Sequence, residues 1–153
     1  MPEISQTAPD FTLPATGGTE VTLSALKGQP VVLFFYPRDD TPGCTKESIA
    51  FSESREAFEA AGAAVFGVSK DSLASHEKFA TKRDLSVPLL SDGNGTVCED
   101  YGVWKEKNMY GKKYMGIERT TYLIAADGTI AQIWNKVKVP GHAEAVLDAV
   151  RAL

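Results

Sequence analysis

The chain has 153 residues, of which 43% are hydrophobic and 24% charged, a composition typical of a globular protein rather than a disordered or disulfide-rich one. Its length fits one domain, and we expect a single domain over residues 1–153. The formal net charge of −4 argues against nucleic acid or an anionic membrane as the main partner. Because no apolar run is long enough to span a membrane and no signal peptide is recognisable, we expect a cytoplasmic protein.

The first predicted elements form a small hairpin and a central strand. Residues Phe11–Leu13 and Glu20–Leu23, separated by Gly17 and Gly18, predict an N-terminal β-hairpin. The run Val31–Tyr36 is apolar at every position, which is typical of a strand covered on both faces. We therefore expect this strand in the middle of a sheet.

A turn and a long helix follow this strand. Residues 37–43 are rich in Pro, Asp and Gly and predict a turn, whereas residues 44–61 contain neither Pro nor Gly and predict a helix. Cys44 therefore falls in the first helical turn. Because Phe51 and Phe58 follow it at intervals of seven, the Cys44 thiol continues the core-facing stripe of the helix.

The rest of the chain alternates between strand and helix patterns. Residues 63–69 predict a strand parallel to residues 31–36, because a helix connects the two. The hairpin expected near the C-terminus makes the sheet mixed. Further elements are a helix at 73–83, a short strand at 87–90, a short helix at 95–101, a hairpin of 120–124 with 129–134, and a helix containing Ala143, Val146, Leu147 and Val150.

A lysine-rich segment lies between the short helix predicted at 95–101 and the hairpin that begins at residue 120. We interpret it as a solvated loop rather than a docking surface for an acidic reductant protein or for nucleic acid, given the acidity of the whole chain. Its charged and aromatic residues are Lys105, Lys107, Lys112, Lys113, Tyr110 and Tyr114.

The chain has two cysteines, Cys44 and Cys98, and two histidines, His76 and His142. Because the cysteines lie far apart in the sequence, we expect no zinc site. Without a secretion signal a structural disulfide is disfavoured, so each thiol serves either packing or chemistry. The histidines have no partner that the sequence identifies, and we assign them no role.

Cys44 has the position of a reactive thiol, at a helix start just after a central strand, where open α/β sheets place their active sites. A free thiol has a pKa of ~8.5, and lowering it to about 6 takes ~3.4 kcal/mol. A helix N-terminus supplies about 2 kcal/mol at most, so a reactive thiol needs a nearby cation. We name Arg119 as this cation; the alternative is that Arg119 only pairs with Glu118.

Ionisation alone makes a weak catalyst, because it raises the concentration of the nucleophile only about 30-fold at pH 7. Donors from Thr41, Gly43 and Cys44, together with a guanidinium, could stabilise charge on a departing oxygen, which fits attack on an O–O bond. A structural alternative exists for each of two residues. Cys44 could serve only to pack one face of the helix, although the turn, the helix start and the neighbouring hydroxyl favour a reactive thiol. Thr41 could cap the start of the helix.

The string Y-P-x-x-x-T-P-G-C-T-x-E over Tyr36–Glu47 resembles the peroxidatic site of the peroxiredoxins. The similarity extends over nearly the whole chain and is to the Q-type group, also called bacterioferritin comigratory proteins. It implies an α/β, thioredoxin-like fold with a central mixed sheet flanked by helices. It also implies reduction of hydrogen peroxide and organic hydroperoxides by a monomer without metal or organic cofactor, with electrons from thioredoxin or another thiol.

The resemblance also implies the roles of five residues. Cys44 becomes the peroxidatic nucleophile, and Thr41 and Arg119 position and polarise the peroxide. Pro37 shields the pocket, and Glu47 orients Arg119.

The chain departs from the family where a resolving cysteine often stands, because the matching positions are Ile49 and Ala80. Cys98 is a possible resolving residue, but we favour buried packing for it. We therefore expect a one-cysteine cycle, in which Cys44 becomes a sulfenic acid that an external thiol reduces through a mixed disulfide. The alternative function is a redox-sensing or chaperone-like binding protein that oxidation of Cys44 switches.

Overall fold

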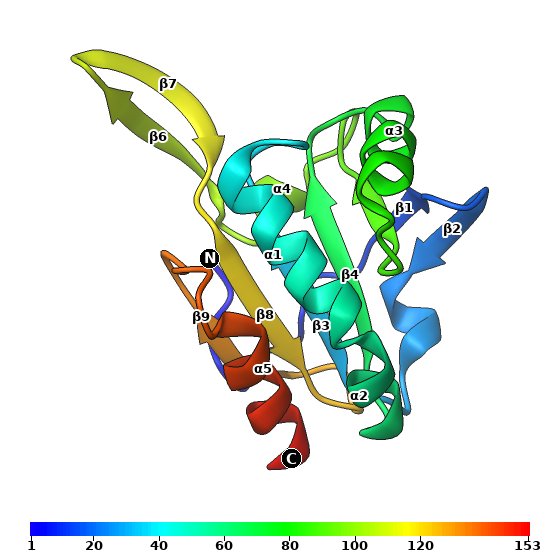
Figure 1. Ribbon diagram of the computed structural model, residues 1–153. Coiled ribbons are helices and arrows are strands. Elements are labelled where there is room, and N and C mark those ends of the chain that lie inside the picture. The colour runs from blue at the N-terminus through cyan, green and yellow to red at the C-terminus, as the bar shows by residue number, and fades with distance from the viewer.

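The computed structural model describes residues 1–153, and a seven-stranded sheet in the order β2-β1-β5-β4-β3-β8-β9 forms its centre (Figure 1). Strand β3 pairs in parallel with β4 on one side and antiparallel with β8 on the other, so the mixed sheet is confirmed. The N-terminal hairpin is confirmed as β1 paired with β2. The strands are β1 (Thr12–Ala15), β2 (Thr19–Thr22), β3 (Val31–Phe35), β4 (Ala64–Ser69), β5 (Leu89–Ser91), β8 (Thr120–Ile124) and β9 (Ile130–Trp134).

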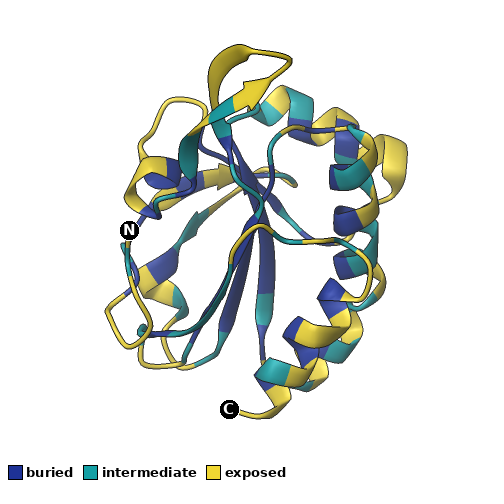
Figure 2. Ribbon diagram, turned by 90° about the vertical axis from the view of Figure 1, so that its left-hand side faces the viewer, coloured by how far each residue is buried: buried dark blue, intermediate teal, exposed yellow.

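The central strand is buried along its whole length because apolar side chains cover both faces of the sheet. Leu33 and Phe35 enter a cluster that contains Cys98, which we call the Cys98 face. Val32 and Phe34 enter the opposite cluster, which contains Cys44 and which we call the Cys44 face. Figure 2 shows the buried strands between layers whose outer surfaces are exposed.

Most of the helical structure covers the Cys44 face. Helices α1 (Pro42–Glu53), α2 (Arg55–Ala60), α3 (Leu73–Arg83) and α5 (His142–Arg151) supply side chains to this cluster. The short helices η1 (Leu23–Leu26) and α4 (Val97–Asp100) supply the Cys98 face. None of the helices combines the length and the apolar character that crossing a membrane requires.

The predicted helix over residues 44–61 begins earlier and is interrupted. Pro42 occupies the first turn, where its missing amide hydrogen costs no bond. At Ser54 the backbone ψ angle is 0°, which separates α1 from α2. Hydrogen bonds from Ser54 N–H to the Ala50 carbonyl and from Phe58 N–H to the Ser54 carbonyl still bridge this point, so no loop separates the two helices.

The expectation of a solvated loop over the lysine-rich segment is wrong. Strands β6 (Trp104–Met109) and β7 (Lys112–Ile117) form a separate two-stranded hairpin that projects from the sheet (Figure 1). Tyr110 and Gly111 connect them with φ angles of 52° and 80°. Two positive φ angles in a two-residue loop are the geometry that joins twisted antiparallel strands, and the polarity of the strands hid this pattern.

Candidate active site

Cys44 is the third residue of α1 and lies beyond the end of the central strand β3. Its side chain faces inward, and the residue is only 1% exposed. The thiol is free. The structure therefore places it as predicted, at a helix start and on the apolar stripe of that helix.

Arg119, which follows β7 and precedes β8, brings a cation to this thiol. Its Nη2 donates to Cys44 Sγ over 3.3 Å, and its Nη1 donates to Glu47 Oε1 over 2.7 Å. The Arg119 side chain is 17% exposed and that of Glu47 is 1% exposed, so water screens this pair little. Burial would lower the pKa of Arg119, but Glu47 and Cys44 outweigh burial and raise it, so the guanidinium stays charged.

Glu47 is buried, and burial disfavours the charged form of its carboxyl group. Burial raises the pKa of Glu47 to about 7, although the nearby Arg119 lowers it. Its Oε2 atom has no hydrogen-bond partner, and neither have the hydroxyls of Thr45 and Ser48 on the same helix. One unpaired oxygen in an apolar interior favours the protonated form of a carboxyl, which is the physical cause of the raised pKa of Glu47.

Gly43 leaves space for the guanidinium. A Cβ atom at this position would lie 3.0 Å from Arg119 Nη2, which is closer than most side chains tolerate. The absence of a side chain at Gly43 therefore allows Arg119 to reach the thiol over the start of α1.

Thr41 and Pro37 are near the site but make no hydrogen bond to the sulfur. Thr41 stands at the N-cap of α1, yet its hydroxyl neither caps the helix nor contacts Cys44. It donates instead to the carbonyl of Arg38 over 2.8 Å, three residues back in the loop. The alternative in which the Thr41 side chain caps the helix is therefore not observed, because the loop carbonyl takes the hydroxyl. Pro37 is half-buried at the start of this loop.

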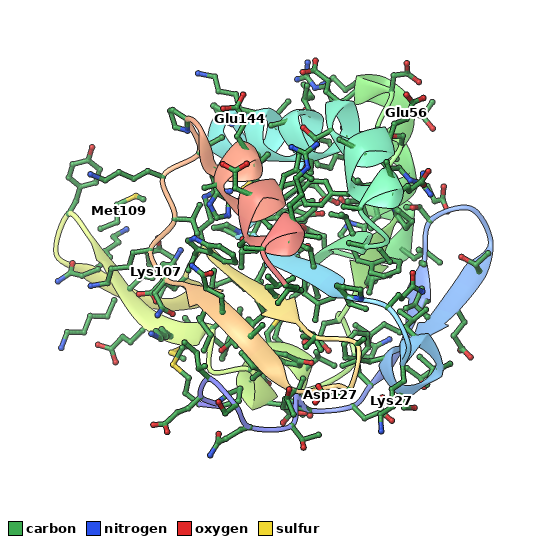
Figure 3. The ribbon with its side chains drawn as sticks, turned by 90° about the horizontal axis from the view of Figure 1, so that it is seen from below. Lys27, Glu56, Lys107, Met109, Asp127 and Glu144 are labelled. Atoms are coloured by element: carbon green, nitrogen blue, oxygen red, sulfur yellow. The ribbon has the colours of Figure 1, made fainter.

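Two neighbouring lysines have different relationships to the site. Lys105 forms an ion pair with Glu118 over 2.9 Å, whereas Arg119 pairs with Glu47. The alternative in which Arg119 only pairs with Glu118 is therefore not observed. Lys107, on the hairpin in Figure 3, is half-buried; burial and Arg119 lower its pKa, while Cys44 raises it. No sequence pattern places Lys107 near Cys44, because a segment predicted as a loop gives no direction to its side chains.

Cys98 lies on the other side of the sheet from Cys44. It is fully buried in the Cys98 face, and its backbone N–H donates to Asp92 over 2.8 Å. Burial and the adjacent Asp92 raise the pKa of the Cys98 thiol far above its ordinary value. A protonated thiol behind the sheet fits packing better than attack on Cys44.

Both histidines have partners that sequence reasoning did not find. His142 Nε2 lies 2.8 Å from the Thr121 hydroxyl, and burial, followed by the charge of Arg119, lowers the pKa of His142 to about 4. His76 is fully buried beside Asp39. Their partners lie 21 and 37 residues away in the chain, which is why no local pattern revealed them.

The arrangement can stabilise an anionic sulfur and accept negative charge from a substrate. Arg119 supplies a planar, permanently charged donor, and the start of α1 adds unpaired backbone N–H groups. These are the elements that a nucleophilic thiol requires.

Comparison with known proteins gives a consistent result. A model described as the AhpC/TSA family matches residues 4–133. The chain is 49% identical to Peroxiredoxin Bcp from Xanthomonas campestris over 143 residues, which are 94% of this chain and 89% of the relative. It is 45% identical to Peroxiredoxin Bcp from Bacillus subtilis over 149 residues, which are 97% and 95% of the two chains.

Solved structures of similar proteins share the fold. A mutant of PrxQ from Xylella fastidiosa superposes with a TM-score of 0.94 at 41% identity, covering 99% of this chain and 97% of the other. The bacterioferritin comigratory protein of Xanthomonas campestris gives a TM-score of 0.88 at 48% identity, covering 93% and 90%. The predicted thioredoxin-like fold is thereby confirmed.

Proposed function

Because the chain belongs to the AhpC/TSA family, as a peroxiredoxin of the Q type, we propose that it reduces hydrogen peroxide and organic hydroperoxides through a sulfenic acid on Cys44. The observation that carries the proposal is the hydrogen bond from Arg119 Nη2 to Cys44 Sγ. It holds a positive charge against the sulfur, which favours the thiolate, the nucleophilic form.

In the first step the Cys44 thiolate attacks one oxygen of the hydroperoxide. A sulfur–oxygen bond forms while the O–O bond breaks, and the second oxygen leaves as an alkoxide or hydroxide that takes a proton to become an alcohol or water. Sulfur is oxidised by two electrons and the peroxide is reduced by two. Arg119 and the N–H groups at the start of α1 stabilise the charge that moves toward the departing oxygen.

In the second step an external thiol restores Cys44. A thiolate attacks the sulfenic sulfur, releasing hydroxide and leaving a mixed disulfide; a second thiol then attacks this disulfide and frees Cys44. We propose thioredoxin or another dithiol protein as this reductant, in the cytoplasm and with the enzyme as a monomer. The one-cysteine cycle is supported by the placement of Cys98 behind the sheet and by Ile49 and Ala80 at the resolving positions.

Steady-state consumption of hydrogen peroxide with thioredoxin, its reductase and NADPH tests the proposal. We expect many turnovers per protein molecule, and we expect Cys44→Ser to abolish them while Cys98→Ala preserves them. Full turnover by Cys44→Ser would refute the enzyme assignment. A single slow turnover by the wild-type protein with every thiol reductant tried would favour the redox-sensing alternative.

A further inference from the structure

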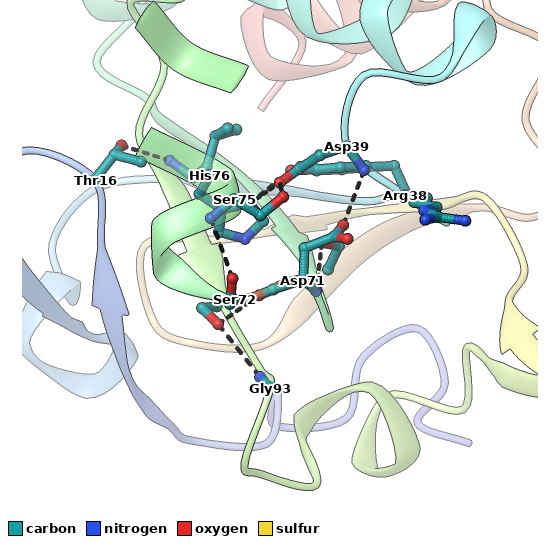
Figure 4. A network of polar contacts seen from close by, with 12 residues as sticks. Thr16, Arg38, Asp39, Asp71, Ser72, Ser75, His76 and Gly93 are labelled. Carbon is teal, nitrogen blue, oxygen red and sulfur yellow. Dashed lines mark hydrogen bonds and ion pairs between the residues drawn. The ribbon is translucent and has the colours of Figure 1, made fainter. Parts of the chain in front are cut away.

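A buried polar network surrounds Asp39, in the loop of residues 37–41 between β3 and α1 (Figure 4). The Asp39 carboxylate accepts hydrogen bonds from Tyr36 Oη over 2.6 Å and from Ser75 Oγ over 2.8 Å. His76 Nδ1 lies 2.7 Å from Asp39 Oδ2. The Asp39 backbone N–H donates to Asp71 over 2.9 Å, so both the side chain and the backbone of Asp39 are fixed.

The hydrogen-bond partners of His76 define its charge. Nε2 lies 2.9 Å from the carbonyl oxygen of Leu90, which can only accept. The Asp39 carboxylate accepts from the hydroxyls of Tyr36 and Ser75, so it also presents an acceptor to the ring. Both ring nitrogens of His76 thus face acceptors, and the geometry points to a ring that donates from both nitrogens, as an imidazolium does. In that state Asp39 and His76 form a buried ion pair.

The same cluster, with Asp71, has ligand atoms within 4.8 Å of one another, a spacing that a metal ion could use. Its atoms are already paired: Asp71 Oδ2 accepts from the Ser69 hydroxyl over 2.6 Å and from the Asp39 N–H. The ring nitrogens of His76 are engaged by Asp39 and Leu90. The network is complete without an ion.

The ion pair connects the segment before Cys44 to the rest of the fold. Asp39 precedes Cys44 by five residues, while His76 lies on α3 and bonds to β5. Cys44 is only 1% exposed, so a protein thiol cannot reach its sulfur in this conformation. The start of α1 must open for reduction, and opening that displaces the 37–41 loop must break the ion pair.

We propose that Asp39 and His76 are positioning residues that hold the 37–41 loop in the closed state, in which Cys44 meets Arg119. This inference rests on the proposed function. The pair sets how often the start of α1 opens, and therefore balances reaction with peroxide, which needs the closed state, against reaction with the reductant, which needs the open one.

Asp39→Asn and His76→Gln test this proposal, because each leaves one buried charge without its partner. We expect the rate of Cys44 oxidation by peroxide to fall at least about tenfold, since less protein is closed. Reduction of the sulfenic form by a protein thiol should be unchanged or faster. Amide exchange in residues 42–47 should accelerate, while amides of β3 and β8 keep their protection.

Asp40→Asn is the matched control. Asp40 lies in the same loop and is joined to the same helix by Lys82 over 2.6 Å and by Arg83 over 2.9 Å, but these pairs are exposed. Exposed pairs contribute little, so Asp40→Asn should change both rates by less than about twofold. Ser75→Ala removes one hydroxyl donor from Asp39, and we expect a smaller effect of the same sign if the ion-pair variants fold poorly.

Nitrogen NMR of His76 in the wild-type protein measures the charge directly. We expect both ring nitrogens to carry protons at neutral pH. A neutral His76 ring, or ion-pair variants that match Asp40→Asn in both rates and in exchange at 42–47, would overturn the proposal. If the wild-type protein consumed no peroxide, the proposed function would fail, while the NMR and exchange results would still decide whether the pair holds the loop.

Discussion

Arg119 and Cys44 are separated by 75 residues in the chain, yet the guanidinium lies 3.3 Å from the sulfur. The contact requires the turn between β7 and β8 to reach over the start of α1, where Gly43 offers no side chain to block it. The same guanidinium also bonds to Glu47, so its orientation is fixed on two sides.

Arg119→Lys should slow the oxidation of Cys44 by peroxide about tenfold to hundredfold. Lysine keeps the charge, but it cannot donate to the sulfur and to Glu47 in the fixed geometry of the guanidinium, and a hydrogen bond to a charged group is worth about 1.5–3 kcal/mol. Stopped-flow kinetics under single-turnover conditions would measure the rate. Arg38→Lys, the same change at an exposed position in the adjacent loop, serves as the control and should retain the wild-type rate.

Glu47→Gln should alter how stability depends on pH. Glu47 has a folded-state pKa of about 7, above the ordinary 4.5, so the stability that it contributes is full below pH 4.5 and is lost as the pH rises through about 7. The unfolding free energy of the wild-type protein relative to Glu47→Gln should therefore fall over this interval, by about 3 kcal/mol at most. Urea unfolding at a series of pH values would measure the difference.

Glu56→Gln provides the comparison for this experiment, because Glu56 is exposed on the neighbouring helix α2. Its unfolding free energy should follow the wild-type value at every pH. A constant difference between the wild-type protein and Glu47→Gln from pH 4.5 to 7 would show that Glu47 does not titrate as described.

His142 should destabilise the protein in acid. Its folded-state pKa of about 4 lies below the ordinary 6.5, so the stability that it contributes is present above pH 6.5 and is lost as the pH falls through about 4. His142→Gln keeps a polar partner for Thr121 but removes the titrating ring. We expect this variant to lose less stability than the wild-type protein over that interval in thermal unfolding, and an equal loss would contradict the assignment.

Cys98→Ala should leave the catalytic cycle intact. After one equivalent of peroxide, intact mass spectrometry of both the wild-type protein and the variant should show the addition of one oxygen, since the sulfenic acid has no thiol within reach. Loss of two hydrogens in the wild-type protein, with a peptide linking Cys44 to Cys98, would instead identify Cys98 as the resolving residue.

The sequence predicted those features that depend on local pattern. The apolar run of β3, the helix over residues 73–83 and the strand over residues 120–124 each have a periodicity or composition that only one element satisfies. The β6–β7 hairpin was missed because its strands are polar and largely exposed, so no buried face produced alternation.

In the candidate site, too, the residues identified by local sequence were predicted, and the contacts that depend on tertiary packing were not. Cys44 could be identified from its turn and helix start, Arg119 was named as the cation that such a thiol requires, and the role of Glu47 came from the family resemblance. The Asp39–His76 pair and the contact of His142 with Thr121 depend on how distant segments pack, which no local spacing encodes. The direction of the Thr41 hydroxyl depends on the position of the Arg38 carbonyl in the loop, so it could not be predicted from the sequence either.

The central claim is that the hydrogen bond from Arg119 Nη2 makes the Cys44 sulfur the nucleophile that attacks peroxide. The rate of Cys44 oxidation by one equivalent of hydrogen peroxide at neutral pH, measured by stopped flow in Arg119→Ala and in the wild-type protein, tests it most directly. We predict that Arg119→Ala slows this oxidation by at least about tenfold, because the sulfur loses a hydrogen bond from a charged donor. Equal rates in the two proteins would contradict the account.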